Sequence, residues 1–155
     1  MSLPMTLLNH RRRHLLAAGT LLAFVRPAAA TPQQMASAIS AYTGNRLPQM
    51  GRIRFEIAQL IDNGNAVPVT IRVDSPMAKD DHVTGIAIFN EKNPETDVVR
   101  FTLGPRAGKA EVSTRIRLAT SQKLVAVAKM SDGSCWQQAV DVIVTLAACI
   151  EWEPM

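Results

Sequence analysis

The chain has 155 residues, which suits one domain and leaves little room for two. Apolar residues make up 47% and charged residues 19%, which excludes a disordered tail, and aromatic residues at 5% are too sparse for a base-stacking surface. The formal charge of +4 does not indicate a nucleic-acid partner. Four of the 17 basic residues lie in the first thirty positions, and the other 13 balance the 13 acidic residues.

The first thirty residues have the organisation of an export signal. An arginine run at 11–13 is followed by a moderately apolar stretch at 15–25, too short to cross a bilayer, and by three alanines at 28–30. We predict a twin-arginine-type signal over residues 1–30 that is cleaved after Ala30, which gives a periplasmic protein without a membrane anchor. A general secretory route also fits the basic residues, and a basic tail or a short anchor is the alternative interpretation.

Residues 31–50 form a lead-in with helical spacing. Met35, Ile39 and Tyr42 recur at intervals of three and four positions, as on one face of a short helix. Pro48 restrains the residue before it and cannot donate to a β-ladder, so the helical segment has to end earlier. The expected element is a short N-terminal helix or a loose lead-in.

From Gly51 onward, apolar residues alternate with polar ones, which is the period of a half-buried strand. Turns such as Asn63-Gly64-Asn65 and Asp132-Gly133-Ser134 separate the alternating segments. We predict an all-β protein with an immunoglobulin-like antiparallel β-sandwich of about seven strands over residues 51–146. The predicted strands are residues 53–57, 67–73, 83–89, 99–103, 112–118, 124–128 and 136–145.

Side chains typical of the common catalytic sites are scarce after residue 30. His82 is the single histidine there, so a histidine metal site cannot form, and Asp80-Asp81-His82 is interpreted as an acidic loop before a strand. The sequence contains no phosphate-binding loop, dinucleotide fingerprint or nucleophile elbow. We therefore predict a protein that is not an enzyme and that has no cofactor and no metal.

The chain has two cysteines, and their contexts differ. Cys135 opens the last predicted strand, where a small buried thiol is ordinary, whereas Cys149 lies beyond that strand. An intrachain disulfide is the obvious alternative in an oxidising compartment. However, a mostly extended stretch of 14 positions spans roughly 40 Å, and a disulfide needs Cα atoms within about 7 Å. Cys149 is therefore predicted to be a functional thiol, in preference to an incidental one.

Several stretches, taken in chain order, carry a resemblance to a known family. They are Asn63-Gly64-Asn65 with Val67-Pro68-Val69, Val73-Asp74-Ser75-Pro76-Met77, Lys92-Asn93-Pro94, the Ser-Thr-Arg-Ile-Arg-Leu-Ala-Thr-Ser-Gln segment at 113–122, and Ser131-Asp132-Gly133. Each stretch is weak alone, but with the export signal and the late cysteine they extend over nearly the whole mature chain. Together they resemble the SoxY family, the sulfur-carrying subunits of the periplasmic thiosulfate-oxidising system.

The resemblance implies an immunoglobulin-like sandwich that pairs with a second β-sandwich subunit, SoxZ, as a heterodimer. It also implies a flexible C-terminal arm over residues 147–155, whose cysteine holds sulfur intermediates covalently while partner enzymes load and unload them. By position, that cysteine is Cys149. The carrier itself would have no turnover of its own.

The arm departs from the usual family pattern at its cysteine. SoxY arms end in Gly-Gly-Cys-Gly-Gly, whereas Ala147, Ala148, Ile150 and Glu151 flank Cys149, as in SoxY-related paralogues with an Ala-Ala-Cys-Ile-Glu arm. Alanine and isoleucine restrict the backbone more than glycine does, and the glutamate disfavours an anionic adduct unless a partner supplies positive charge. The arm therefore favours an oxidised sulfur species or a small thiol-reactive metabolite other than thiosulfate.

A second class of function stays open from the sequence. The chain would then be a non-catalytic binding or assembly subunit whose C-terminal tail clamps a partner. Ile150 and Trp152 would be the anchors of that interface, and Cys149 would be incidental or disulfide-linked to the partner.

Overall fold

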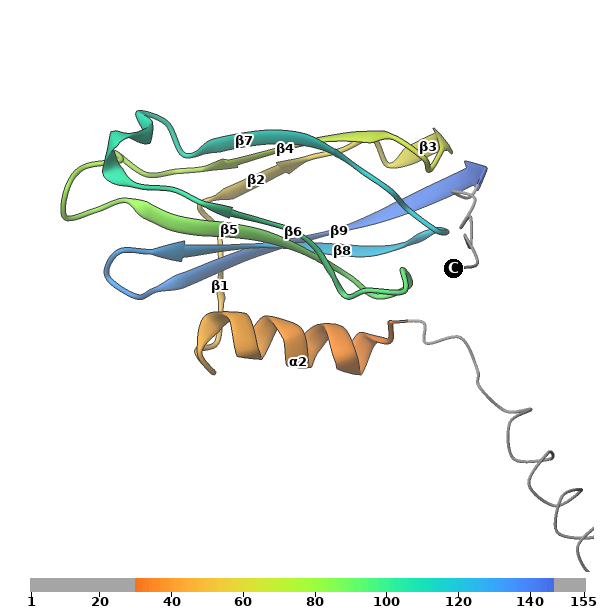
Figure 1. The fold of residues 1–155 in the computed structure, drawn as a ribbon, viewed down its shortest axis with the longest axis horizontal. Helices are drawn as coiled ribbons and strands as arrows, with labels where there is room; N and C mark the ends of the chain where they lie inside the picture. Colours follow the sequence, from red (N-terminus) through yellow and green to blue (C-terminus); the bar gives the residue numbers. More distant parts are fainter. Residues whose placement is uncertain (1–29, 147–155) are drawn as a thin grey trace, which may run out of the picture.

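The computed structural model describes residues 30–146, in which two β-sheets stack face to face and helix α2 (Pro32–Thr43) lies lengthwise against the outer face of the larger sheet (Figure 1). This architecture confirms the predicted β-sandwich with a short N-terminal helix. The larger sheet contains β1 (Gln49–Met50), β3 (Leu60–Asn63), β5 (Val83–Asn90), β6 (Asp97–Thr102), β8 (Gln122–Met130) and β9 (Cys135–Leu146). The smaller sheet contains β2 (Ile53–Glu56), β4 (Val67–Val73) and β7 (Glu111–Ile116), and a 3₁₀ turn, η2 (Pro105–Ala107), precedes β7.

The described residues form nine strands, two more than the alternation predicts, and the larger sheet is mixed rather than purely antiparallel. The strand order in the larger sheet is β1-β9-β8-β5-β6, with β3 also paired to β9. Both β1 and β3 run parallel to β9, whereas the other pairs are antiparallel. The two additional strands have two and four residues. Segments this short give no readable period, and strand direction depends on tertiary pairing that periodicity does not encode.

From β1 to β5, successive strands belong alternately to the larger and the smaller sheet. It passes from β1 to β2 through Gly51 and Arg52, both of which have positive φ (109° and 54°). A side chain at Gly51 would be strained at this φ, and its Cβ would lie 3.6 Å from the Trp136 ring. The turn therefore places β2 in the smaller sheet directly after β1 has paired with β9.

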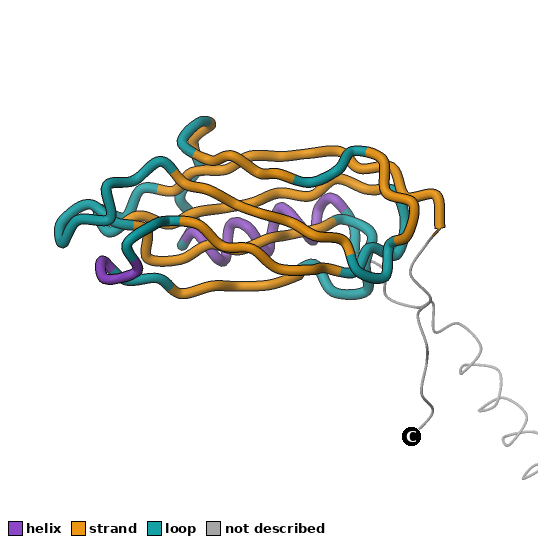
Figure 2. The backbone as a smooth tube through the Cα atoms, turned by 90° about the horizontal axis from the view of Figure 1, so that it is seen from above, coloured by secondary structure: helices purple, strands orange, loops and turns teal. Residues whose placement is uncertain are grey.

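Most of the core lies between the two stacked sheets, in one cluster that includes the buried alternate residues of β4 together with residues of β5 and β8. Phe89, Ala87, Val125 and Val127 form a second apolar cluster on the opposite face of the larger sheet, together with Met35 of the helix. This second cluster explains why β5 is apolar on both sides. The helix covers its outer face, and Figure 2 shows α2 running along the strands beneath the sandwich.

The helix is fixed by its caps and by one aromatic side chain. The Thr31 hydroxyl accepts from the backbone N–H of Gln34, and Gly44 ends the helix in the left-handed region at φ 65°. Tyr42 packs edge-on against Phe89, with ring centroids 5.6 Å apart, and Lys129 lies 4.4 Å from the tyrosine centroid. Burial raises the pKa of Tyr42 to about 12. The phenol is thus held un-ionised between helix and sheet.

Gly85 on β5 permits this close approach of Tyr42. A Cβ at this position would meet the Tyr42 hydroxyl at 2.8 Å and the Phe101 carbonyl oxygen at 3.3 Å. We expect Gly85→Ala to lower the free energy of unfolding by about 1–3 kcal/mol because the helix has to move outward. Chemical denaturation measures the effect, and Tyr42→Phe in the same chain should restore part of the loss.

Gly104→Ala is the matched control for this substitution. A Cβ at Gly104 would meet no atom within 4 Å, and the residue has an ordinary extended φ of −136°. We expect this control to leave the free energy of unfolding essentially unchanged. If Gly85→Ala and Gly104→Ala lowered the free energy of unfolding equally, the contact with Tyr42 would not be what excludes a larger residue at position 85.

Candidate functional site

The residues predicted to carry the chemistry, Cys149 with Ala147, Ala148, Ile150 and Glu151, lie outside the described residues. The structure does describe the strand end that directly precedes the arm, residues 147–155. We call this point the arm base and define it as residues 143–146 of β9 with β3 and Ser121. It lies at the end of the sandwich where β9 finishes beside β3 (Figure 1).

Strand β3 holds one side of the arm base. Leu60 is paired in register with Ile143, and Asn63 with Leu146. The Ile143 N–H donates to the Gln59 carbonyl oxygen at 2.8 Å, and the Leu146 carbonyl oxygen accepts from the Gly64 N–H at 2.9 Å. The backbone of β9 is therefore hydrogen-bonded up to the last described residue.

Ser121 holds the other side, at the point where β8 no longer pairs with β9. The antiparallel β8–β9 ladder ends at the pair formed by Gln122 and Val142, so Val144 lies beyond it. The Val144 N–H instead donates to the Ser121 hydroxyl oxygen at 2.8 Å, and the same hydroxyl lies 3.5 Å from the Val144 carbonyl oxygen. The Thr145 hydroxyl adds a bond to the Asp62 carbonyl oxygen at 3.1 Å. Side chains thus replace the missing part of the ladder.

Two asparagines tie together the loops beside the arm base. Asn90 is fully buried, and its side chain oxygen accepts from the N–H groups of Lys92 and Asn93 while its amide donates to the Glu95 carbonyl oxygen. The Asn93 side chain oxygen accepts from the Ala119 N–H at 3.0 Å, and its amide donates to the Arg117 carbonyl oxygen at 2.8 Å. This network connects the β5–β6 loop to the loop that contains Ser121.

The sequence alone indicates no bonding role for these loop segments, although they belong to the stretches that resemble the SoxY family. The structure shows that Asn93 and Ser121, which lie in those stretches, bond the chain around the arm base. Asn90 lies outside those stretches and is not predicted as a site residue. The available signal was Asn93-Pro94 directly after an apolar strand, because asparagines at such turns bond the backbone nearby.

Cys135 lies at the opposite end of β9 from the arm base. It is 3% exposed, and burial raises the pKa of its thiol, although Arg46 and Lys129 act in the opposite direction. The first residue of β9 and Leu146 are separated by roughly 36 Å if the 12-residue strand is extended. Three further residues reach at most about 11 Å beyond Leu146. This geometry agrees with the expectation that Cys135 and Cys149 do not bridge within one chain.

Other candidate sites in residues 30–146 have structural explanations. The His82 ring nitrogen Nδ1 lies 3.1 Å from the Ala78 carbonyl oxygen, which closes the loop before β5. Within this part of the chain, no group of three or more His, Cys, Asp or Glu side chains gathers as around a metal ion. The described helices also include none with the length and apolar character needed to cross a membrane.

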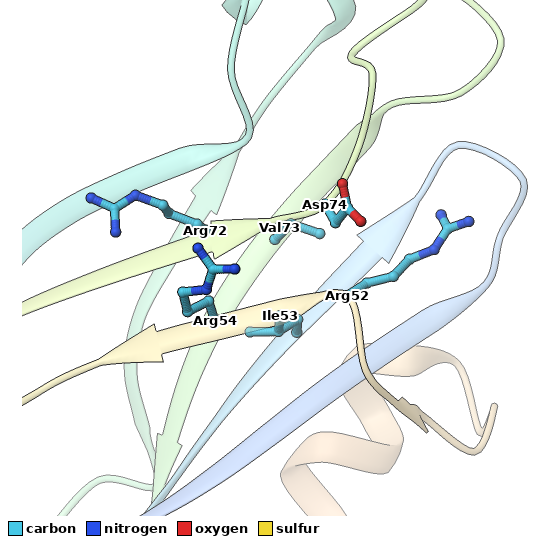
Figure 3. Close-up of a pocket in the computed structure, with 6 residues that line it drawn as sticks. All are labelled: Arg52, Ile53, Arg54, Arg72, Val73 and Asp74. Atoms are coloured by element: carbon cyan, nitrogen blue, oxygen red, sulfur yellow. The ribbon is translucent and has the colours of Figure 1, made fainter.

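A surface hollow of about 410 Å³ opens between the ends of β2 and β4 (Figure 3). Its guanidinium groups do not converge on one point. Arg72 is engaged by Glu56 and by Glu111, the latter at 3.0 Å, and Figure 3 shows Arg52 pointing away from Arg54. The hollow is lined by Arg52, Ile53, Arg54, Arg72, Val73 and Asp74. It has the character of a solvated sheet surface.

Comparisons with solved structures first establish the fold. A superoxide reductase, a neelaredoxin variant from Ignicoccus hospitalis, matches with a TM-score of 0.55, and a protein from Thermotoga maritima that is described as a putative superoxide reductase matches with a TM-score of 0.53. Their identities are 16% and 17%, and the matches cover 74% and 63% of this chain and 92% and 87% of those chains. Likeness at these identities shows a shared sandwich and nothing about the chemistry.

A solved sulfur carrier gives a more specific match. The sulfur carrier protein SoxY from Chlorobium limicola f thiosulfatophilum is 31% identical, with a TM-score of 0.61 over 75% of this chain and 100% of that chain. A search of curated proteins found no match. The family model for the sulfur oxidation protein SoxY matches residues 39–149, a range that includes the arm base and Cys149. The chain therefore belongs to the SoxY family of sulfur oxidation proteins.

Proposed function

We propose that this protein is a periplasmic carrier that holds a sulfur-containing intermediate covalently on Cys149 and presents it to partner enzymes. Membership of the SoxY family gives the general role, a carrier in sulfur oxidation. The observation that carries the finer assignment is the arm base. Cys149 follows a hydrogen-bonded strand end by three residues, so its thiol leaves the sandwich from a fixed point.

The geometry separates the two tasks of a carrier. The sandwich is a folded body with a buried core, and the arm base fixes where residues 147–155 begin. Because three residues reach at most about 11 Å, the Cys149 Cα stays within that distance of Leu146. A partner enzyme that docks on this end of the sandwich would therefore receive the thiol within a small volume, which raises its effective concentration.

Loading of the arm is a two-electron oxidation. The Cys149 thiol and a sulfur species with a free S–H group lose two protons and two electrons to the acceptor of a partner enzyme, and one S–S bond forms. A reductant that returns two electrons and two protons cleaves the bond and restores both thiols. Glu151 and Glu153 place negative charge beside the thiol, so the carried species is proposed to be one other than thiosulfate unless the partner supplies cations.

The proposal includes a partner subunit and an export route. The SoxY family works within a system that includes SoxZ, and we propose that a SoxZ-like β-sandwich subunit forms a heterodimer with this chain. Residues 1–30 would direct export, through the twin-arginine route that accepts folded proteins, so a partner without a signal could cross with it. Enzymes that load and unload the arm complete the set of partners.

Mass spectrometry of the protein, isolated without reductant from its own bacterium, tests the carrier assignment. We expect an adduct on the peptide that contains Cys149, and we expect reductant to remove it. Cys135 is the internal control, because its buried thiol should carry no adduct in the same sample. A plain Cys149 thiol under every growth condition, or a stable disulfide to a partner chain, would favour the binding subunit instead.

A further inference from the structure

Two large apolar side chains of the arm base are exposed. Leu60 on β3 is 62% exposed and Ile143 on β9 is 60% exposed, and the two residues are paired in register. Their chain neighbours Ile61 and Val142 are buried at 6% and 2%, so the exposed pair lies on the opposite face of the sheet from the core. We call Leu60 and Ile143 the base patch.

The base patch lies on the same face of the larger sheet as helix α2. Val125 packs in the cluster under the helix, and its register partner on β9 is Ala139. Ile143 follows Ala139 by four residues and therefore points to the same side. The helix covers β5 and β8, whereas the end of β9 and its partner β3 have no described cover.

The arm has the composition and the position to cover this patch. It begins at residue 147, next to Leu146, and contains Ile150 and Trp152. In an extended segment these two side chains share one side while Glu151 and Glu153 share the other, which gives an apolar face and a charged face.

The distances permit the arm to turn back. Trp152 follows Leu146 by six residues and can reach up to about 22 Å from it. Ile143 precedes Leu146 by three strand residues, which span roughly 10 Å. A turn over residues 147–149 therefore leaves enough chain for Ile150 and Trp152 to arrive at the base patch. Because the segment is tethered beside its target, even a weak apolar contact is populated.

We propose that the base patch is a docking site for the arm of the same chain, where Ile150 and Trp152 pack on Leu60 and Ile143. In the docked state Cys149 lies in the turn against the end of the sandwich, and its thiol is shielded until a partner takes the arm. The proposal rests on the proposed function for its purpose, the protection of a carrier thiol. The contact itself is an independent physical claim.

The two tryptophans of the chain make docking measurable. Labelling with 5-fluorotryptophan gives one ¹⁹F resonance for Trp136 and one for Trp152, assigned with Trp152→Phe. In the full chain we expect the Trp152 resonance to move toward that of the free arm peptide when Leu60→Ser and Ile143→Ser are introduced. Alkylation of Cys149 by iodoacetamide should accelerate roughly tenfold, which corresponds to a lost contact of about 1.4 kcal/mol.

Matched variants separate docking from a general loss of structure. Leu47→Ser changes an apolar residue that is 91% exposed near the opposite end of β9, and it should alter neither signal. Trp152→Ala should accelerate alkylation of Cys149 as much as the patch variant does. The combination of the two should add nothing further, because both remove one contact.

The outcomes separate this proposal from the carrier assignment. A Trp152 resonance identical in the unaltered chain, the patch variant and the free peptide would overturn docking. If, in addition, the patch variant weakened binding of a SoxZ-like subunit, the patch would be a partner surface. Patch-dependent shielding of Cys149 without any sulfur adduct in the cell would support docking and contradict the carrier function.

Discussion

Cys149→Ser is expected to abolish oxidation of the carried substrate by living cells while the protein keeps its fold. The serine hydroxyl cannot form the S–S bond, so loss of the single sulfur atom should remove the whole activity and not a fraction of it. The structure gives no reason for a change in stability. The described sandwich, residues 30–146, has its own core and its own hydrogen bonds up to Leu146.

Cys135→Ala is the matched control because it removes the other thiol. Cys135 is buried at the start of β9, so this variant should lose some stability through the small cavity but retain oxidation. Growth on the reduced sulfur compound, with the wild-type gene deleted, measures both variants, and circular dichroism checks their folding. Full oxidation by the Cys149→Ser strain would remove the basis of the carrier proposal.

The sequence was sufficient for the architecture because burial alternates along strands such as β2 and β4. In β4, every residue predicted to face inward is buried, from Val67 to Val73. The helical spacing of Met35, Ile39 and Tyr42 also identifies the face of α2 that packs on the sheet. These patterns are local, since each depends only on which side of one element meets the core.

The parallel pairing of β3 with β9 could not be predicted in this way. It joins Leu60 to Ile143, more than eighty positions apart, and a four-residue strand has too few side chains to show a period. The same pairing creates the arm base and the exposed base patch. The position of the predicted carrier cysteine came from family resemblance, whereas the surroundings of the arm required tertiary structure.

The burial of Asn90 could not be predicted from the sequence either, although the turn that follows an apolar strand indicates that an asparagine here can bond nearby backbone groups. Its acceptors and donors are backbone groups of the following loop, including the Asn93 N–H at 2.8 Å. Nothing in the residue type distinguishes a buried asparagine from an exposed one at a turn. Only the position of β5 between two neighbours and under the helix makes this one inaccessible.

Asn90→Leu should cause the largest loss of stability among the variants of the described residues discussed above. Leucine has the same number and branching of side-chain heavy atoms, so the substitution removes the hydrogen bonds without opening a cavity. The Asn93 N–H and the Glu95 carbonyl oxygen would lose their partners, whereas the Lys92 N–H would keep its bond to the Gln122 side-chain oxygen at 3.1 Å. We expect the free energy of unfolding to fall by about 3 kcal/mol. Urea denaturation measures this change.

The loss of stability in Asn90→Leu should also extend to the arm base, where hydrogen exchange gives a second and more specific measurement. Asn93 bonds the segment at Arg117 and Ala119, and Ser121 in the same loop bonds Val144. Hydrogen exchange should therefore accelerate at Ala119 and Val144 as well as in the β5–β6 loop. Asn65→Leu, in an exposed turn, is the control and should change stability by less than about 0.5 kcal/mol. If Val144 kept its protection in Asn90→Leu while the β5–β6 loop exchanged freely, the asparagines would not hold the arm base, and Ser121 alone would position it.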